Sequence, residues 1–172
     1  MELEFYPTTI FRETPKVTFF DAGIDSSNGC DVVVHLGEAI SPPNDSEDEQ
    51  YYVHNHQIDH NLVITGERKF VLINPLWDEP HHVIYLNRKM GALEIPIGTY
   101  HRSISSKDGS VVLNQPIRDK FFDPNKEFIP QKLNKLDLIK ARKSPPVYWI
   151  VENDQIKRLR FNPLERKAAI FN

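Results

Sequence analysis

Short runs of apolar and β-branched residues recur along most of the chain, and Gly, Asn, Asp or Pro clusters separate most of them. Many short strands at this spacing are typical of a β-sandwich or a β-barrel rather than of a parallel α/β sheet. Thr65-Gly66-Glu67 predicts a hairpin turn between two of the runs. The predicted strands are Lys16–Asp21, Cys30–Leu36, Tyr51–His56, Asn61–Thr65, Lys69–Ile73, His82–Leu86, Ala92–Ile95, His101–Ile104 and Ser110–Gln115.

The pattern changes after Pro130. The segment Gln131–Lys143 has Leu133 and Leu136 at helical spacing, which predicts a short basic helix that ends before Ser-Pro-Pro. Two further runs, Val147–Val151 and Gln155–Phe161, flank a turn and predict a hairpin. We expect one domain over residues 1–172, with its core at about 16–120 and the helix plus hairpin at about 131–172.

The acidic, proline-containing segment Ser41–Gln50 has no large apolar residue, so we expect a mobile surface loop there. A lid over a nearby site is the alternative interpretation. The single cysteine, Cys30, cannot form an internal disulfide, and its position at a strand start predicts a buried structural thiol.

Composition narrows the class of protein. The 172 residues are 40% hydrophobic and 26% charged, which is ordinary for a globular protein. A formal net charge of −3 argues against a nucleic-acid binder. No long uncharged apolar run predicts a membrane span, and the first residues lack the pattern of a signal peptide. We therefore predict a cytoplasmic location.

The histidines carry the clearest chemical signal. Of seven in the chain, three form the pattern His54-x-His56-x-x-x-His60, and His101 follows a Pro-x-Gly turn. Imidazole is the commonest metal ligand in proteins and titrates near neutral pH. Residues two apart share one face of a strand, so His54 and His56 are expected to point the same way, with His60 joining them if the register is kept. The pattern predicts a metal site or an acid–base pocket inside a β-structure.

Two stretches between Tyr51 and Ser105 resemble the motifs of the cupin superfamily. The first is His54-Asn55-His56, followed by His60 and Gly66, and the second is Gly91, Pro96-Ile97-Gly98, His101 and Ser105. Three positions depart from the pattern: His60 replaces the usual Glu, Ser105 replaces the last Asn, and Asp48 stands at the first Gly. The resemblance implies an all-β fold, a cupin-type double-stranded β-helix or jelly-roll barrel. It places His54, His56, His60 and His101 at the mouth as metal ligands.

An all-imidazole site suits a divalent transition metal such as Fe, Ni, Zn or Cu. The expected function is then that of a metalloenzyme, a dioxygenase or an isomerase, acting on a small oxygenated organic molecule.

A second similarity points to another class. His56, the run Leu62–Asn74 and the run Glu94–His101 are similar to sugar-nucleotide 3,5-epimerases and ketoisomerases. That family has the same kind of barrel and needs no metal, because a histidine acts as base and a tyrosine as acid. The resemblance implies His56 as the base, with Asp59 or Asp119 orienting it, and Tyr100 or Tyr52 as the acid. The Arg-Gly expected before the base is absent, since Tyr52-Val53 stands there.

A third interpretation is a barrel that binds a small molecule without catalysis and whose histidines are structural. Other polar residues have simpler interpretations. His35 is interpreted as structural, His81-His82 as an exposed strand end, and Arg68-Lys69 as a solvated patch. Arg118 either contacts an anionic substrate or forms a surface salt bridge with Asp119 or a neighbour. We also expect a homodimer that forms through barrel edges or the C-terminal hairpin.

Overall fold

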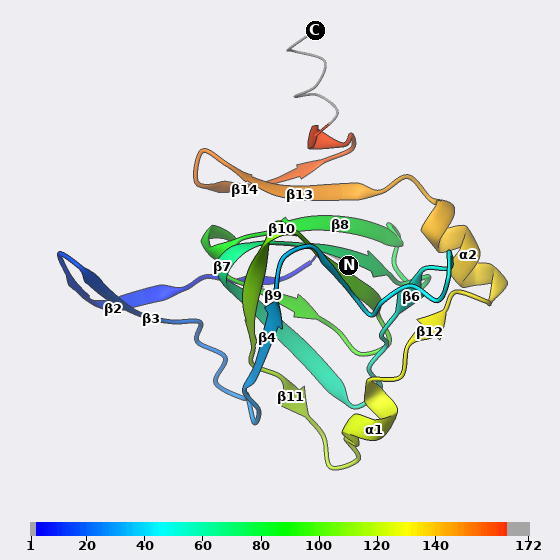
Figure 1. Ribbon diagram of the computed structural model, residues 1–172, viewed down its shortest axis with the longest axis horizontal. Coiled ribbons are helices and arrows are strands. Elements are labelled where there is room, and N and C mark those ends of the chain that lie inside the picture. The colour runs from blue at the N-terminus through cyan, green and yellow to red at the C-terminus, as the bar shows by residue number, and fades with distance from the viewer. Residues whose placement is uncertain (1–2, 165–172) are drawn as a thin grey trace, which may run out of the picture.

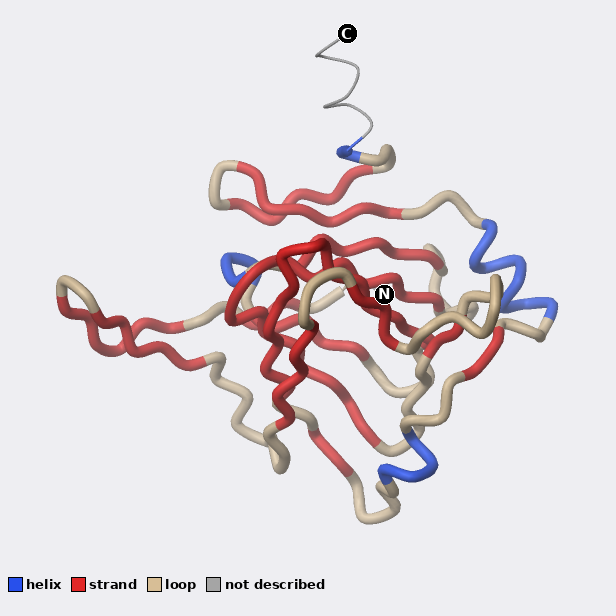
Figure 2. Tube along the Cα trace, in the orientation of Figure 1, coloured by secondary structure: helices blue, strands red, loops and turns tan. Residues whose placement is uncertain are grey.

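The computed structural model describes residues 3–164, and strands dominate it (Figures 1 and 2). The helical elements are a 3-10 turn, η1 (Arg88–Met90), and the helices α1 (Pro124–Glu127) and α2 (Leu136–Lys143). The strands are β1 (Phe5–Tyr6), β2 (Thr9–Thr14), β3 (Val17–Asp21), β4 (Asp31–His35), β5 (Ala39–Ser41), β6 (Gln50–Tyr51), β7 (Gln57–Ile73), β8 (His81–Leu86), β9 (Ala92–Ile95), β10 (Tyr100–Asn114), β11 (Ile117–Arg118), β12 (Gln131–Lys132), β13 (Val147–Glu152) and β14 (Gln155–Leu159).

Two long antiparallel strands, β7 and β10, form the spine of the fold. Their pairing runs from Tyr100 opposite Ile73 to Asn114 opposite Asn61. Strands β8, β9 and β11 pair with β7, whereas β4 and β5 pair with β10. The paired strands curl around one interior, which gives the barrel seen in Figure 1.

The spine bends at two glycines. Gly66 has φ +77°, and a Cβ at this position would lie 2.6 Å from the carbonyl oxygen of Gly109. The register of the β7–β10 pair shifts between Ser105 and Ser110. Gly66 therefore bends one continuous strand, and the hairpin turn predicted at residues 65–67 is wrong. For the same reason, four of the predicted strands merge in pairs into β7 and β10.

The predicted strand Tyr51–His56 is also wrong beyond Tyr51, where β6 ends. Tyr52 forms a single backbone bridge with His101, and the chain then leaves the sheet. The backbone amides of Asn55 and His56 donate to the carboxylate of Glu127 instead of to a neighbouring strand. Residues 52–56 therefore have no strand periodicity. By contrast, β9 coincides with its prediction, and β3, β4 and β8 lie within one residue of theirs. The predicted exposure of His81 and His82 is wrong, because both are buried at the start of β8.

Both faces of the spine are covered. Along β7, Phe70 and Leu72 belong to the interior apolar cluster. Val71 and Ile73 face outward against Leu138 of α2. Nearer the start of β7, Leu62 points outward and packs with Ala22 and Ile24 of the N-terminal segment in a separate apolar cluster. Double coverage explains why β7 is buried over most of its length.

The C-terminal part extends the sheet. Helix α2 occupies only the second half of the predicted helix and ends before Ser144, as predicted. The predicted hairpin is confirmed as β13 and β14, and both Asn153 and Asp154 have positive φ, as tight hairpin turns require. Strand β13 pairs in parallel with β8. Residues 165–172 of the predicted segment lie outside the described residues.

The acidic segment between β5 and β6 is a loop, as predicted, and four ion pairs hold it, two from Lys132 and one each from Arg102 and Arg142. Lys132 Nζ lies 2.8 Å from Asp45, and Arg142 Nε lies 2.9 Å from Glu49. These contacts hold the loop against β12 and α2. Cys30 is exposed, so its predicted burial is wrong; it lies just outside β4. Within residues 3–164, no helix is both long and apolar enough to cross a membrane.

Candidate functional site

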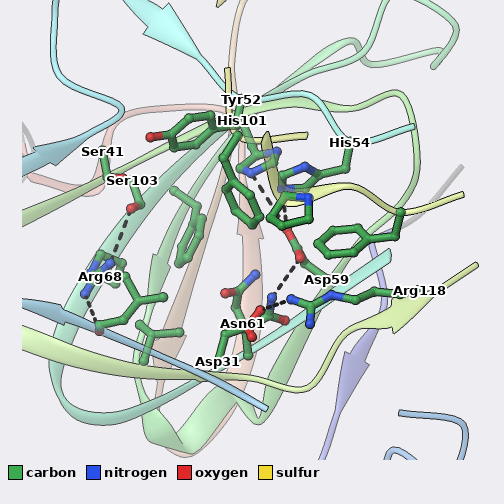
Figure 3. A pocket seen from close by; sticks show the side chains of 17 residues that line it. Asp31, Ser41, Tyr52, His54, Asp59, Asn61, Arg68, His101, Ser103 and Arg118 are labelled. Atoms are coloured by element: carbon green, nitrogen blue, oxygen red, sulfur yellow. Dashed lines mark hydrogen bonds and ion pairs between the residues drawn. The ribbon is translucent and has the colours of Figure 1, made fainter. Parts of the chain in front are cut away.

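A cavity of about 510 Å³ occupies the interior of the barrel beside the apolar cluster (Figure 3). Strands β7 and β10 contribute much of its wall, and the segment that follows β11 contributes aromatic side chains. Its lining includes Asp31, Tyr52, His54, Asp59, Asn61, Arg68, His101, Ser103, Arg118, Phe122 and Phe128.

Two imidazoles and one carboxylate meet in this cavity. Nε2 of His54 lies 3.5 Å from Oδ2 of Asp59, and Nε2 of His101 lies 3.7 Å from the same oxygen. The two imidazole rings are 4.9 Å apart between centroids. All three side chains are buried. We call this group the His54–Asp59–His101 triad.

The positions of the triad follow from the strands. Asp59 lies on β7 and points inward with Asn61, whereas His60 and Leu62 point to the covered outer face. His101 lies at the start of β10 with Ser103 on the same face. Backbone hydrogen bonds of 2.9 and 2.8 Å join Tyr52 to His101, which brings the segment carrying His54 beside β10.

The hydrogen bonds of Asp59 fix its carboxylate. Oδ1 accepts from Nε2 of Gln57 at 2.6 Å and from Nδ2 of Asn114 at 2.8 Å. Both partners are neutral donors, so they orient the carboxylate without cancelling its charge. The other oxygen, Oδ2, is left facing the two imidazoles.

His101 presents a nitrogen suited to accept a proton. Its Nδ1 donates to the carbonyl oxygen of Thr99 at 3.1 Å. The neutral ring therefore carries its proton on Nδ1 and leaves Nε2 bare toward Asp59. Burial lowers the pKa of His101, and the carboxylate of Asp59 opposes that effect. Two acceptors facing each other at this distance call for a proton, a cation or a substrate hydrogen between them.

Glu127 positions the other imidazole. This buried carboxylate at the end of α1 accepts from the backbone N–H of Asn55 at 2.8 Å. The same oxygen lies 3.5 Å from Nδ1 of His54, an atom without a hydrogen-bond partner in the described part of the chain. His54 thus lies between two carboxylates, with one nitrogen toward each.

Aromatic rings enclose the imidazoles. The ring of Tyr52 is nearly parallel to that of His54, with centroids 6.5 Å apart, and Phe128 contacts His54 edge-on at 4.9 Å. Elsewhere in the lining, Arg118 donates from Nε to Gln57 at 2.7 Å, pairs with Asp31 and lies over the ring of Phe122. Arg118 therefore forms its salt bridge with Asp31 and not with the expected Asp119, which contacts His56.

The structure brings together two of the four predicted histidine ligands. His54 and His101 meet in the cavity, whereas His56 is more than a third exposed and contacts Asp119 at 2.9 Å. His60 lies on the outer face of β7, where Nε2 contacts Glu94 at 3.1 Å. The expectation that His54, His56 and His60 share a face is wrong, because residues 52–56 are irregular and β7 points His60 outward.

The predicted residues of the metal-free alternative also separate. His56 does contact Asp119, one of the two carboxylates expected beside it, but this pair lies outside the cavity lining. Tyr100 lies on the outer face, where it packs against the apolar cluster that contains Tyr51, Val71 and Ile73. Tyr52, the other acid candidate, lines the cavity together with His101.

Sequence reasoning misplaced one residue of the site and missed another. Asp59 was considered only as a partner of His56, on the strand face opposite the histidines, and one position of register turns it inward. Glu127 comes from a segment more than sixty residues from His54, and no local pattern indicates the contact. Asp59 and Asn61, two polar residues on one strand face, were the only local sign, and the same alternation is typical of a face in solvent.

No protein-family model matches the sequence, and no curated protein matches it. Solved structures do match the fold. The RmlC epimerase of Mycobacterium tuberculosis is 11% identical with a TM-score of 0.51, over 74% of this chain and 66% of that one, just under two thirds of its length. A 3,4-ketoisomerase from Helicobacter canadensis is 13% identical with a TM-score of 0.51, over 75% and 90%.

A variant of the 3,4-ketoisomerase QdtA from Thermoanaerobacterium thermosaccharolyticum, in complex with TDP, is 13% identical with a TM-score of 0.53, over 81% of this chain and 92% of that one. At these identities the likeness establishes the fold. The predicted cupin-type barrel is confirmed, and the structures it matches are of the RmlC-like kind.

Proposed function

We propose that this cupin-type barrel is a proton-transfer enzyme, an epimerase or ketoisomerase that acts on a keto sugar linked to a nucleotide. The convergence of His54, Asp59 and His101 beside Tyr52 carries the proposal. The substrate class is supported by the matched structures, which include 3,4-ketoisomerases and a QdtA complex with TDP-4-keto-6-deoxyglucose.

His101 is the proposed base. Its bare Nε2 takes the proton from the carbon next to the ketone, and the electron pair of the broken C–H bond forms an enolate. The imidazole gains a positive charge in this step. Asp59, 3.7 Å away, stabilises that charge. Burial keeps the imidazole neutral beforehand, which is the state a base needs.

Tyr52 is the proposed acid, because its ring lies 6.2 Å from that of His101 between centroids and lines the same cavity. Its phenol gives a proton to the enolate. The phenolate then takes a proton from solvent, and His101 releases to solvent the proton that it took from the substrate. Protonation of the same carbon from the opposite face inverts that centre. Protonation of the former carbonyl carbon, with loss of the proton on the neighbouring hydroxyl, moves the ketone instead.

Deuterium exchange tests this proposal. TDP-4-keto-6-deoxyglucose incubated in D₂O with the protein should gain deuterium next to its ketone. His101→Asn should abolish the gain, and His56→Asn, which alters an imidazole outside the cavity lining, should leave it unchanged. Retention of exchange in His101→Asn would refute the assignment. Binding without exchange in the unaltered protein would favour the non-catalytic interpretation.

A divalent metal site is the second candidate. One ligand atom each from His54, Asp59 and His101 lie within 4.8 Å of one another. Two imidazoles and a carboxylate suit Fe, Zn or Ni. These three residues would hold the ion, which would supply Lewis acidity to a bound carbonyl group.

Metal analysis of the purified protein, before and after chelation, tests this second candidate. About one equivalent per chain, lost in His101→Asn and kept in His60→Asn, would support it. His60 is the matched control because it is equally buried but faces the other side of β7. Metal content that is unaffected by His101→Asn would refute the assignment.

We also propose a homodimer that uses a barrel edge. Strand β4 pairs only with β10 among the described strands, and it exposes Val32 and Val34 by 63% and 51%. The β2–β3 hairpin projects from the barrel in Figure 1 and exposes Phe11. Light scattering should give twice the chain mass, and Val34→Glu should halve it. A monomer at all concentrations would refute the dimer. The cytoplasmic location stays a prediction.

A further inference from the structure

The proposed proton transfer does not use one buried cation of the cavity. Arg68 lines the cavity from β7 and is only 1% exposed. Neutral groups satisfy its guanidinium. Nε donates to Ser110 Oγ at 2.6 Å, and Nη1 donates to His35 Nε2 at 3.1 Å and to Ser103 Oγ at 3.3 Å. Nη2 donates to the carbonyl oxygens of Val33 and Ser110.

No carboxylate within residues 3–164 forms an ion pair with Arg68. The three other arginines that are buried or half-buried in the described part of the chain each have one. Arg102 lies 3.4 Å from Glu49, Arg142 lies 2.9 Å from the same residue, and Arg118 pairs with Asp31. An unpaired charge in the interior of a protein is costly, so natural sequences rarely keep one without a use.

His35 is neutral, so it does not balance the positive charge of Arg68. Because its Nε2 accepts from Arg68, its Nδ1 carries the proton and donates to Ser105. Burial and the neighbouring guanidinium lower the pKa of His35 to about 4. Burial also lowers the pKa of Arg68, to about 10, which still leaves the guanidinium charged at neutral pH. The cation therefore lies among neutral groups.

The distance from Arg68 to the triad fits a sugar ring. Ser103 and His101 lie two residues apart on the same face of β10, which separates them by about 7 Å at roughly 3.3 Å per residue. Arg68 Nη1 contacts Ser103, as the dashed line in Figure 3 shows. A six-membered ring can therefore place one carbon at His101 and a substituent of a neighbouring carbon at Ser103 and Arg68.

We infer that Arg68 and Ser103 form a subsite for a carboxylate carried by the sugar, so that the substrate is a nucleotide-linked keto sugar acid of the uronic type. The inference rests on the proposed function, since the triad sets where the ring lies. A carboxylate would take the place of the Ser103 hydroxyl on Nη1 and accept a hydrogen bond from that hydroxyl. It would neutralise the guanidinium, which is almost fully buried.

Paired binding experiments with UDP-glucuronate and UDP-glucose test this inference, because the two differ only in the carboxylate. By calorimetry, UDP-glucuronate should bind roughly ten- to a hundredfold more tightly, the range expected for a hydrogen bond between charged groups. In Arg68→Gln the difference should vanish while the affinity for UDP-glucose is unchanged. Arg68→Lys, which keeps the charge, should retain part of it.

Arg102→Gln is the matched control, since Arg102 is equally buried on β10 but is not part of the cavity lining. It should keep the full preference. The Nε–Hε signal of Arg68 in the unaltered protein gives a local measurement that does not depend on the folding of any variant. It should shift with UDP-glucuronate and not with UDP-glucose.

Four results would overturn the carboxylate subsite: equal affinities in the unaltered protein, binding of neither sugar, a preference that persists in Arg68→Gln, or equal losses for both sugars in Arg68→Gln. The last result would mean that Arg68 contacts the phosphates. Equal affinities together with deuterium exchange on a neutral keto sugar would leave the proton transfer intact. A carboxylate preference without exchange on any keto sugar would refute the proton transfer and keep the subsite.

Discussion

The charge of Asp59 is the part of the triad whose effect can be worked out most directly. Asp59→Asn keeps the shape of the side chain and removes one negative charge 3.7 Å from Nε2 of His101. At an effective dielectric constant of about 20, that charge stabilises an imidazolium at this distance by about 4 kcal/mol. If the proposed base is correct, the rate of proton abstraction should fall roughly a thousandfold.

Two measurements check this prediction. The first is the rate of deuterium uptake by TDP-4-keto-6-deoxyglucose. The second is the NMR titration of the Cε1–Hε1 signal of His101, whose pKa should fall further because the carboxylate no longer opposes burial. Asp31→Asn is the control, since it removes an equal charge from the same cavity at a residue paired with Arg118. A folded Asp59→Asn protein with exchange within tenfold of the unaltered rate would refute the reasoning.

Three further predictions concern the surroundings of the triad. Glu127→Gln should slow deuterium exchange by about tenfold and weaken the carboxylate's bond to the N–H of Asn55, at a cost of about 1–2 kcal/mol in the free energy of unfolding; unchanged values for both would contradict its positioning role. His56→Asn, which removes the contact with Asp119 at the surface, should leave the melting temperature within a degree or two, and a large shift would show that this pair holds the site together. Acid should destabilise the fold through His82, because burial lowers its pKa to about 4 and its Nδ1 accepts from Trp149. Its folded pKa lies below the unfolded value of about 6.5, so the stabilisation is complete above pH 6.5 and is lost as pH falls toward 4, by about 2 kcal/mol at pH 5. Urea unfolding followed by tryptophan fluorescence at pH 7 and pH 5 measures that loss, which should be smaller in His82→Gln; an equal loss in both proteins would refute the assignment to His82.

The sequence predicts the class of fold because period-two patterning survives wherever one strand face meets the core. Strand β9 and the hairpin β13–β14 are examples, since turn residues mark their ends. Gly66 misled the prediction. Glycine signals a turn and a bend equally well, and only the close approach of Gly109 identifies this one as a bend within β7.

The site was predictable in part. His54 and His101 were identified from motif spacing, and the structure brings them together. Asp59 and His60 exchanged faces because the prediction extended strand alternation through residues 52–56, which are irregular. Arg68 could not be identified as a buried cation, because Arg68-Lys69 has the local composition of a solvated patch. Its burial depends on contacts with β4 and β10 that no local pattern shows.

The pairing of β7 with β10 has a consequence for how the protein folds. Asp59 and His101 lie on opposite ends of partner strands about forty residues apart in the chain, and Arg68 lies where the two strands bend. Bringing Asp59 and His101 together closes a loop of about forty residues, which costs chain entropy before the long-range contacts form. Folding should therefore be slow for a chain of this size. The amides of β7 and β10 should exchange with solvent only on global unfolding, and the triad should assemble and be lost in the same cooperative step as the barrel itself.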